Sequence, residues 1–134
     1  MPKKWILVVD DDPSILSMVA DALEHPALSV TTATDAAQAF VQARDLKPVV
    51  IVSDIQMPGH DGPSIIEHLR ADANVPRMPI VFMTGMDLVK ARELLPKGDP
   101  TIRLVQKPFD LEMVRDCVWD LAGLNEVLPP KGWG

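Results

Sequence analysis

The sequence has little of what marks secreted or membrane-spanning proteins. Its 134 residues include one cysteine, Cys117, so an internal disulfide is excluded. No apolar run approaches the roughly 18 residues that a transmembrane helix needs, and the N-terminus lacks the hydrophobic segment of a signal peptide. We therefore expect a cytoplasmic protein without a membrane segment.

Basic residues are also few. The 13 lysines and arginines stand against 19 aspartates and glutamates, which gives a net charge of −6. This balance argues against a surface that attracts nucleic acid or an anionic membrane, and we expect neither as a direct partner of this domain. The length and the hydrophobic share of 47% are typical of one globular domain. We expect that domain over residues 1–124, followed by a C-terminal tail or the start of a linker over 125–134.

Short apolar runs alternate with segments of helical periodicity along the chain. Asp12, Asp35 and Asp110 stand where helices are expected to begin and have the side chain of a good N-cap. Repeated strand–helix units with short connections predict an α/β fold, in which helices cover both faces of a five-stranded parallel sheet to make three layers. The five strands are expected at 5–9, 28–33, 49–52, 79–83 and 102–106.

Chemically active side chains follow four of these strands, where ligands bind in sheets of this kind. They are Asp10, Asp11 and Asp12 after the first strand, Asp54 after the third, Thr84 after the fourth and Lys107 after the fifth. Asp12 is accounted for as a helix cap. The other residues are expected to meet at one edge of the sheet.

Three carboxylates at one edge, those of Asp10, Asp11 and Asp54, would repel one another. Two carboxylates about 4 Å apart repel by about 4 kcal/mol at an effective dielectric constant of about 20. Such a group requires a cation or retains a proton. A hard divalent ion with oxygen ligands, Mg²⁺ in the first instance, relieves the repulsion and keeps coordination positions for water or phosphate. The alternative is a set of ordinary solvated carboxylates.

Four motifs together resemble those of bacterial two-component response-regulator receiver domains. They are Val8-Val9-Asp10-Asp11, the segment SDIQMPG at 53–59, Thr84-Gly85 and Lys107-Pro108-Phe109, each at the end of a predicted strand. The resemblance covers about residues 5–124. It implies a flavodoxin-like, doubly wound sheet with strand order 2-1-3-4-5. It also implies a phosphorylation-dependent signalling switch, which is no enzyme beyond its own phosphoryl transfer and slow autodephosphorylation.

The resemblance implies a role for each residue of the metal and phosphoacceptor site. Asp54 is the phosphoacceptor, since a carboxylate can act as a nucleophile toward phosphorus. Asp11, Asp54 and the backbone carbonyl of Gln56 ligate Mg²⁺, and Asp10 holds a metal-bound water. The ammonium of Lys107 binds one phosphoryl oxygen.

The same resemblance implies the parts of a switch. Thr84 binds a phosphoryl oxygen once the phosphate is in place, and Gly85 leaves room for its movement. Pro108 follows a cis peptide bond that aims Lys107 inward. The aromatic side chain that moves with the threonine in the family is replaced here by Leu104, which is a departure from the pattern.

Two positions tune the lifetime of the aspartyl phosphate in the family, and Gln56 and Met86 occupy them here. Gln56 can orient a water molecule, whereas the apolar Met86 would shield the phosphate. We therefore expect a phosphorylated state that lives longer than in receivers with an acidic residue at the Met86 position. The alternative is that Met86 only fills space in the core.

The implied phosphodonor is a histidine kinase or a histidine phosphotransfer protein. The implied output is a downstream protein, a fused effector domain or a homodimer, each acting through the face formed by the fourth helix, fifth strand and fifth helix.

Two other functions compete with the receiver. In a phosphohydrolase of the haloacid-dehalogenase type, Asp10-x-Asp12-x-Ser14 would be the nucleophile motif, with Thr84 and Lys107 as partners; no acidic pair follows Lys107 as that family requires. A degenerate receiver would act as a constitutive interaction module, which Leu104 favours and the three acids disfavour.

Overall fold

The computed structural model describes residues 3–57, 60–73, 77–95, 97–107 and 111–124, with the backbone alone for 56–66. Its main sheet has five strands in the order β2-β1-β3-β6-β7, and all neighbouring strands are parallel. The strands are β1 (Lys4–Val9), β2 (Leu28–Ala33), β3 (Val50–Asp54), β6 (Ile80–Thr84) and β7 (Ile102–Gln106). The predicted fold and strand order are confirmed.

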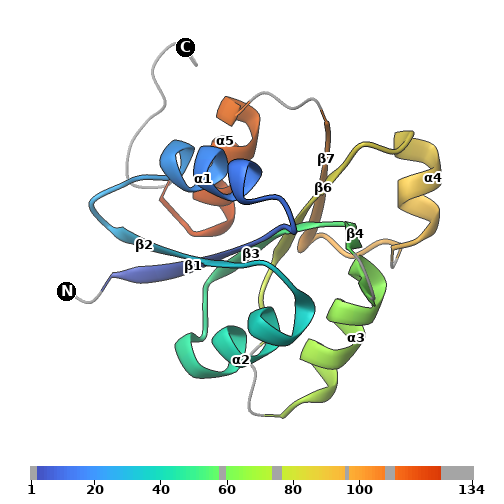
Figure 1. The fold of residues 1–134 in the computed structure, drawn as a ribbon, viewed down its shortest axis with the longest axis horizontal. Helices are drawn as coiled ribbons and strands as arrows, with labels where there is room; N and C mark the ends of the chain where they lie inside the picture. The colour runs from blue at the N-terminus through green and yellow to red at the C-terminus, as the bar shows by residue number, and fades with distance from the viewer. Residues whose placement is uncertain (1–2, 58–59, 74–76, 96, 108–110, 125–134) are drawn as a thin grey trace.

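Helices cover both faces of this sheet (Figure 1). Helices α1 and α5 lie on one face, and α2 and α3 lie on the other. Helix α4 contributes Ala91 to the same apolar cluster as α2 and α3. The helices are α1 (Pro13–Ala22), α2 (Ala36–Leu46), α3 (Gly62–Ala71), α4 (Leu88–Glu93) and α5 (Leu111–Leu121). No helix within the described ranges has the length and apolar character that crossing a membrane requires.

Two apolar clusters fill the space between the sheet and its helices. Consecutive strand residues alternate between the clusters because the side chains of a strand point to opposite faces. Phe82, for example, packs toward α2, α3 and α4, whereas the next residue, Met83, packs toward α1 and α5. Both side chains are completely buried. The sheet is therefore fixed from both sides, which holds the ends of its strands in place.

The helix starts follow the sequence analysis where the structure describes them. Asp12 accepts a hydrogen bond from the backbone N of Ser14 at 2.8 Å, and Asp35 accepts one from Gln38 at the same distance. Asp110 and the tail at 125–134 lie outside the described residues.

The strand ends differ from the prediction in a way that matters for the site. Strands β3 and β6 continue as far as Asp54 and Thr84, which pair with their neighbours as strand residues. The segment after β3 contains an additional antiparallel pair, β4 (Gln56–Met57) with β5 (His60–Asp61). Hydrophobic patterns end where polar side chains begin, whereas backbone pairing continues through Asp54 and Thr84.

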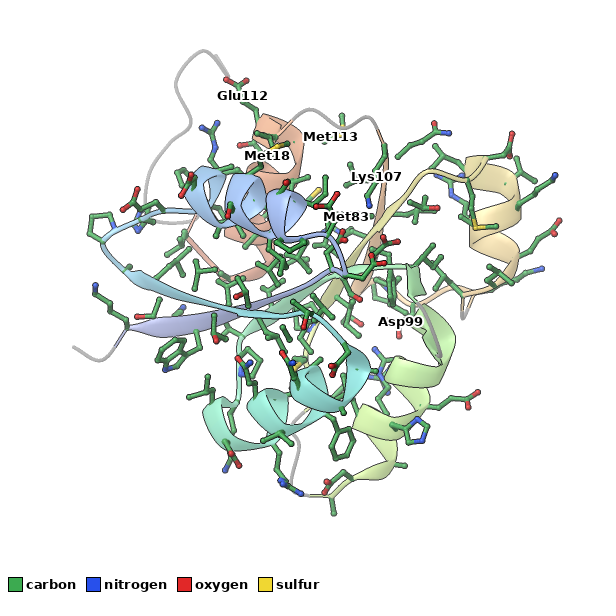
Figure 2. All side chains as sticks on the ribbon, in the orientation of Figure 1. Met18, Met83, Asp99, Lys107, Glu112 and Met113 are labelled. Atoms are coloured by element: carbon green, nitrogen blue, oxygen red, sulfur yellow. The ribbon has the colours of Figure 1, made fainter. Side chains whose placement is uncertain are left out.

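A cluster around Asp99 ties the opposite end of the sheet together. Its Oδ2 lies 2.8 Å from Arg70 and 3.0 Å from Arg77, and its Oδ1 accepts bonds from the backbone N and hydroxyl of Thr101 at 2.9 and 2.5 Å. Figure 2 shows Asp99 well separated from Lys107. The two bonds from Thr101, and then the charge of Arg70, hold the pKa of Asp99 well below its ordinary value of 3.8 although burial opposes them.

We expect Asp99→Asn to lower the free energy of unfolding by about 2 kcal/mol at pH 7, because the charge-assisted bonds are lost. A lowered folded pKa stabilises the protein above the ordinary carboxyl pKa, and this stabilisation is lost as the pH falls through the lower folded value. Urea unfolding should therefore give a difference between variant and parent that is constant from pH 7 to 5 and shrinks below about pH 4.

Asp120→Asn is the matched control, since Asp120 forms a mostly exposed ion pair with Arg103 at 3.2 Å. An exposed pair contributes about 0–1 kcal/mol. A difference for Asp99→Asn that stays the same from pH 7 to 3 would contradict the assignment.

Candidate functional site

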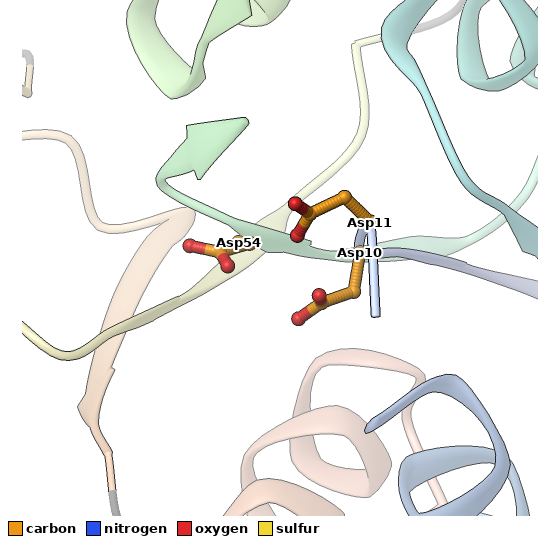
Figure 3. A group of neighbouring side chains, drawn as sticks. All are labelled: Asp10, Asp11 and Asp54. Atoms are coloured by element: carbon orange, nitrogen blue, oxygen red, sulfur yellow. The ribbon is translucent and has the colours of Figure 1, made fainter. Parts of the chain in front are cut away.

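Three carboxylates converge at the carboxyl end of the sheet. Asp10 and Asp11 directly follow β1, and Asp54 is the last residue of the adjacent strand β3. Figure 3 shows their side chains gathered around one space. One oxygen from each residue lies within 4.8 Å of the others. The structure thus brings together the three acids that the sequence analysis selected.

Lys107, which directly follows β7, joins this group. Its Nζ lies 3.0 Å from Oδ2 of Asp54 and 3.2 Å from Oδ2 of Asp10. The side chain of Asp10 is 1% exposed, that of Asp54 13% and that of Lys107 23%. Because these charges are largely shielded from water, their attraction is stronger than that of a surface ion pair. The ammonium therefore lies directly beside the proposed phosphoacceptor.

Burial and neighbouring charges shift the pKa values of Asp10 and Lys107. Burial raises the pKa of Asp10, and the negative charge of Asp54 adds to the effect; the Asp12 amide and Lys107 oppose it. Burial alone would lower the pKa of Lys107, but its hydrogen bond to Asp54 and the charges of Asp54 and Asp10 outweigh this and raise it. Lys107 is therefore a cation at neutral pH.

The donor set suits a hard divalent cation. When ionised, the three carboxylates outnumber the single ammonium of Lys107, and all offer the oxygen ligands that Mg²⁺ prefers. Asp10 already accepts bonds at both oxygens, from the Asp12 amide at 2.9 Å and from Lys107. This arrangement suits Asp10 to an orienting role beside Asp11 and Asp54, the direct ligands that the family resemblance implies.

Thr84 completes the edge at the end of β6. It is completely buried, and its Oγ1 accepts a hydrogen bond from the backbone N of Met86 at 2.9 Å. The backbone N of Lys107 donates to the carbonyl of Thr84 at 2.5 Å, which fixes the two strand ends to each other. A Cβ added at Gly85, which directly follows Thr84, would meet no atom within 4 Å outside its two chain neighbours, so the structure leaves open space at Gly85.

Comparison with known proteins identifies the family. The family model described as the response regulator receiver domain matches residues 6–118. This chain belongs to the response-regulator receiver family. The match favours the receiver over the phosphohydrolase, as does the use of Asp12 as a helix cap rather than as a free acid.

Individual relatives give the same result. The chain is 36% identical to the probable transcriptional regulatory protein TcrX of Mycobacterium tuberculosis over 111 residues, which are 81% of this chain and 45% of TcrX. It is 30% identical to the transcriptional regulator RpaA of Synechocystis over 129 residues, which are 96% of this chain and 52% of RpaA. The receiver therefore spans about half the length of these curated relatives.

Solved structures show the same fold. The chemotaxis response regulator CheY4 of Vibrio cholerae is 26% identical, with a TM-score of 0.77 over 89% of this chain and 98% of CheY4. A receiver domain titled as BeF3-activated DrrB is 23% identical, with a TM-score of 0.73 over 90% of this chain and 98% of that one.

The remaining predicted residues of the receiver lie around this site or outside the described part. Leu104 and Met86 are partly buried and pack against the cluster between the sheet and α2, α3 and α4. Gln56 begins β4, two residues after Asp54. Pro108 lies outside the described residues, so its peptide bond stays a prediction.

Leu104 also faces a groove on the receiver surface. The groove has a volume of about 930 Å³ and lies between α4 and the edge strand β7. Leu104 and Ile102 line it from β7, and Cys117 lines it from α5. Burial raises the pKa of the Cys117 thiol, so this half-buried side chain stays in its neutral form.

The sequence analysis missed one polar contact next to the site. The Nε2 of Gln106, the last residue of β7, donates to the backbone carbonyl of Met86 at 3.0 Å. Gln106 directly precedes Lys107 and lies two residues after Leu104, so its side chain is on the same face of β7 as that of Leu104. These two features could have marked Gln106 as a residue next to the site.

Proposed function

We propose that this receiver is a phosphorylation-dependent switch that accepts one phosphoryl group on Asp54. The observation that carries the proposal is the ammonium of Lys107, which contacts both Asp54 and the buried Asp10 beside a third carboxylate. A cation at that place can neutralise a phosphoryl oxygen on Asp54. The phosphodonor is a histidine kinase or a histidine phosphotransfer protein.

The side chains divide the work of the transfer. A carboxylate oxygen of Asp54 forms a bond to phosphorus while the phosphorus–nitrogen bond of a phosphohistidine breaks, and the leaving imidazole takes up a proton from solvent. Lys107 exchanges part of its contact with Asp54 for a phosphoryl oxygen. The hydroxyl of Thr84 accepts from the Met86 amide and so has its own hydrogen to donate to another phosphoryl oxygen.

Mg²⁺, held by Asp11, Asp54 and the carbonyl of Gln56, would supply further positive charge to the phosphoryl oxygens. Asp10 is held by its bonds to Lys107 and the Asp12 amide, and it orients the metal site from this fixed position. With the phosphoryl group bound covalently, the receiver undergoes one transfer per signalling event and slow autodephosphorylation, and it does not turn over a substrate.

The output follows from the surface next to the site. We place it on the face of α4, β7 and α5, where it controls a downstream protein, a fused effector domain or a second copy of the receiver. Some relatives, such as MtrA of Mycolicibacterium smegmatis, are named as DNA-binding regulators. The receiver acts in the cytoplasm. Because its net charge is −6, it does not contact DNA itself.

Intact mass after incubation with acetyl phosphate tests the proposed function. We expect one added phosphoryl group per chain with Mg²⁺ and none when a chelator removes the metal. Steady hydrolysis of a phosphomonoester would instead show a phosphohydrolase. Failure both to gain a phosphoryl group and to bind Mg²⁺ would show a constitutive interaction module.

Met86→Glu is expected to speed the loss of the phosphoryl group by roughly tenfold, because a carboxylate in this position can activate a water molecule. The measurement is the decay of the phosphorylated mass after the donor is removed. Met86→Leu keeps an apolar side chain and should decay like the parent. An unchanged or slower decay of Met86→Glu would show that Met86 only fills space.

A further inference from the structure

Gln106 links β7 to the loop that carries Thr84. Its side-chain Nε2 donates to the carbonyl of Met86, and the backbone N of Met86 donates to the hydroxyl of Thr84. The two distances are 3.0 and 2.9 Å. One side chain of β7 is thus connected, through both backbone groups of a single residue, to the buried hydroxyl proposed to bind phosphate.

The position of this contact in the sheet gives it a mechanical role. Thr84 is paired with Gln106 at the end of the β6–β7 ladder, and the backbone N of Lys107 makes the next bond, to the carbonyl of Thr84. The contact between Gln106 and Met86 extends the connection two residues further, into the loop before α4. It therefore acts where the regular backbone pairing of the two strands no longer does.

The face of β7 that carries Gln106 also borders the groove beside α4. Residues two apart in a strand share a face, so Gln106 lies on the same face of β7 as Ile102 and Leu104. These two residues line the groove beside α4. The side chain of Leu104 is aliphatic and forms no hydrogen bond. Gln106 instead connects this face of β7 to the loop after β6 through its hydrogen bond to Met86.

We propose that Gln106 is a positioning residue for Thr84. By holding the carbonyl of Met86, it keeps the amide of that residue on the hydroxyl oxygen of Thr84, so that the hydroxyl hydrogen is directed to a phosphoryl group on Asp54. This proposal rests on the proposed function, because it concerns the same phosphoryl group.

Binding of beryllofluoride with Mg²⁺ tests the proposal without phosphoryl transfer. The probe concentration that gives half of the full thermal stabilisation is compared between the parent and Gln106→Met, a variant of similar length without a donor. The loss of one exposed hydrogen bond corresponds to a roughly three- to tenfold change in affinity, and we expect weaker binding by that factor. Gln106→Lys retains a donor and should bind like the parent.

A double-mutant cycle shows whether Gln106 acts through Thr84. In a Thr84→Val background, Gln106→Met is expected to change the affinity by less than about twofold, because the hydroxyl that it positions is gone. An equal loss in both backgrounds would overturn the proposal. Unchanged binding by Gln106→Met in the parent background would also overturn it.

Gln42→Met is the matched control. The Nε2 of Gln42 also donates to a backbone carbonyl, that of Thr32, at 2.9 Å, but on β2 and α2. We expect parental affinity, and a loss equal to that of Gln106→Met would contradict the proposal. If the parent fails to bind beryllofluoride with Mg²⁺, the proposed function fails; if the parent binds and Gln106→Met binds equally, this inference alone fails.

Discussion

Asp54→Asn is expected to gain no phosphoryl group from acetyl phosphate, whereas the parent gains one. An amide has no anionic oxygen with which to attack phosphorus, so the loss should be complete within the detection limit of intact-mass measurement. The substitution also removes a partner of Lys107 and one of the three proposed metal-site carboxylates. We therefore expect Mg²⁺ to raise the melting temperature of the variant less than that of the parent.

Asp12→Asn is the control for this experiment. It makes the same chemical change two residues after Asp10, at a side chain that caps α1, and asparagine caps a helix about as well as aspartate. We expect parental phosphoryl uptake. Uptake by Asp54→Asn at the parental level would place the acceptor elsewhere, and a loss in Asp12→Asn would revive the phosphohydrolase interpretation.

Lys107→Met is expected to slow phosphoryl uptake by about 100-fold, which is typical when one charge-stabilising donor is removed from a reaction site. The methionine keeps the length of the side chain but brings no charge to the phosphoryl oxygens. It also leaves the carboxylate of Asp10, which is 1% exposed, without its cation. The measurement is the rate of mass gain at saturating Mg²⁺, with folding checked by circular dichroism.

Lys90→Met provides the comparison, because Lys90 is an exposed lysine on α4. It should accept the phosphoryl group at the parental rate. Lys107→Arg keeps the charge in a larger, planar group and should recover only part of the rate. A rate for Lys107→Met within a few-fold of the parental rate would show that its ammonium plays no direct part.

The sequence predicted the fold because apolar patterning is explicit in it. The continuous apolar run at 5–9 is typical of a strand buried on both faces, as is the run at 49–52. The gathering of Asp10, Asp11 and Asp54 followed from the rule that parallel strands end at one edge. Strand order and the role of each residue came from the family resemblance, not from patterning.

Other features depend on contacts that no local pattern encodes. Arg70 lies on α3, Arg77 lies before β6 and Asp99 lies before β7, so their ion pairs form only when the folded chain brings these segments together. The hydrogen bond between Gln106 and Met86 likewise depends on the path of a loop. Patterns report which face of an element is buried, whereas the pairing of polar side chains across elements is decided by tertiary structure.

The arrangement of the site also makes phosphorylation of Asp54 depend on a folded chain. Its five side chains come from the ends of four strands that are brought together only by the assembled sheet. A nascent, truncated or partly unfolded copy lacks the juxtaposition of Asp54 with Lys107. Under the proposed function, only folded copies would therefore accept the phosphoryl group, and unfolded ones would stay unmodified.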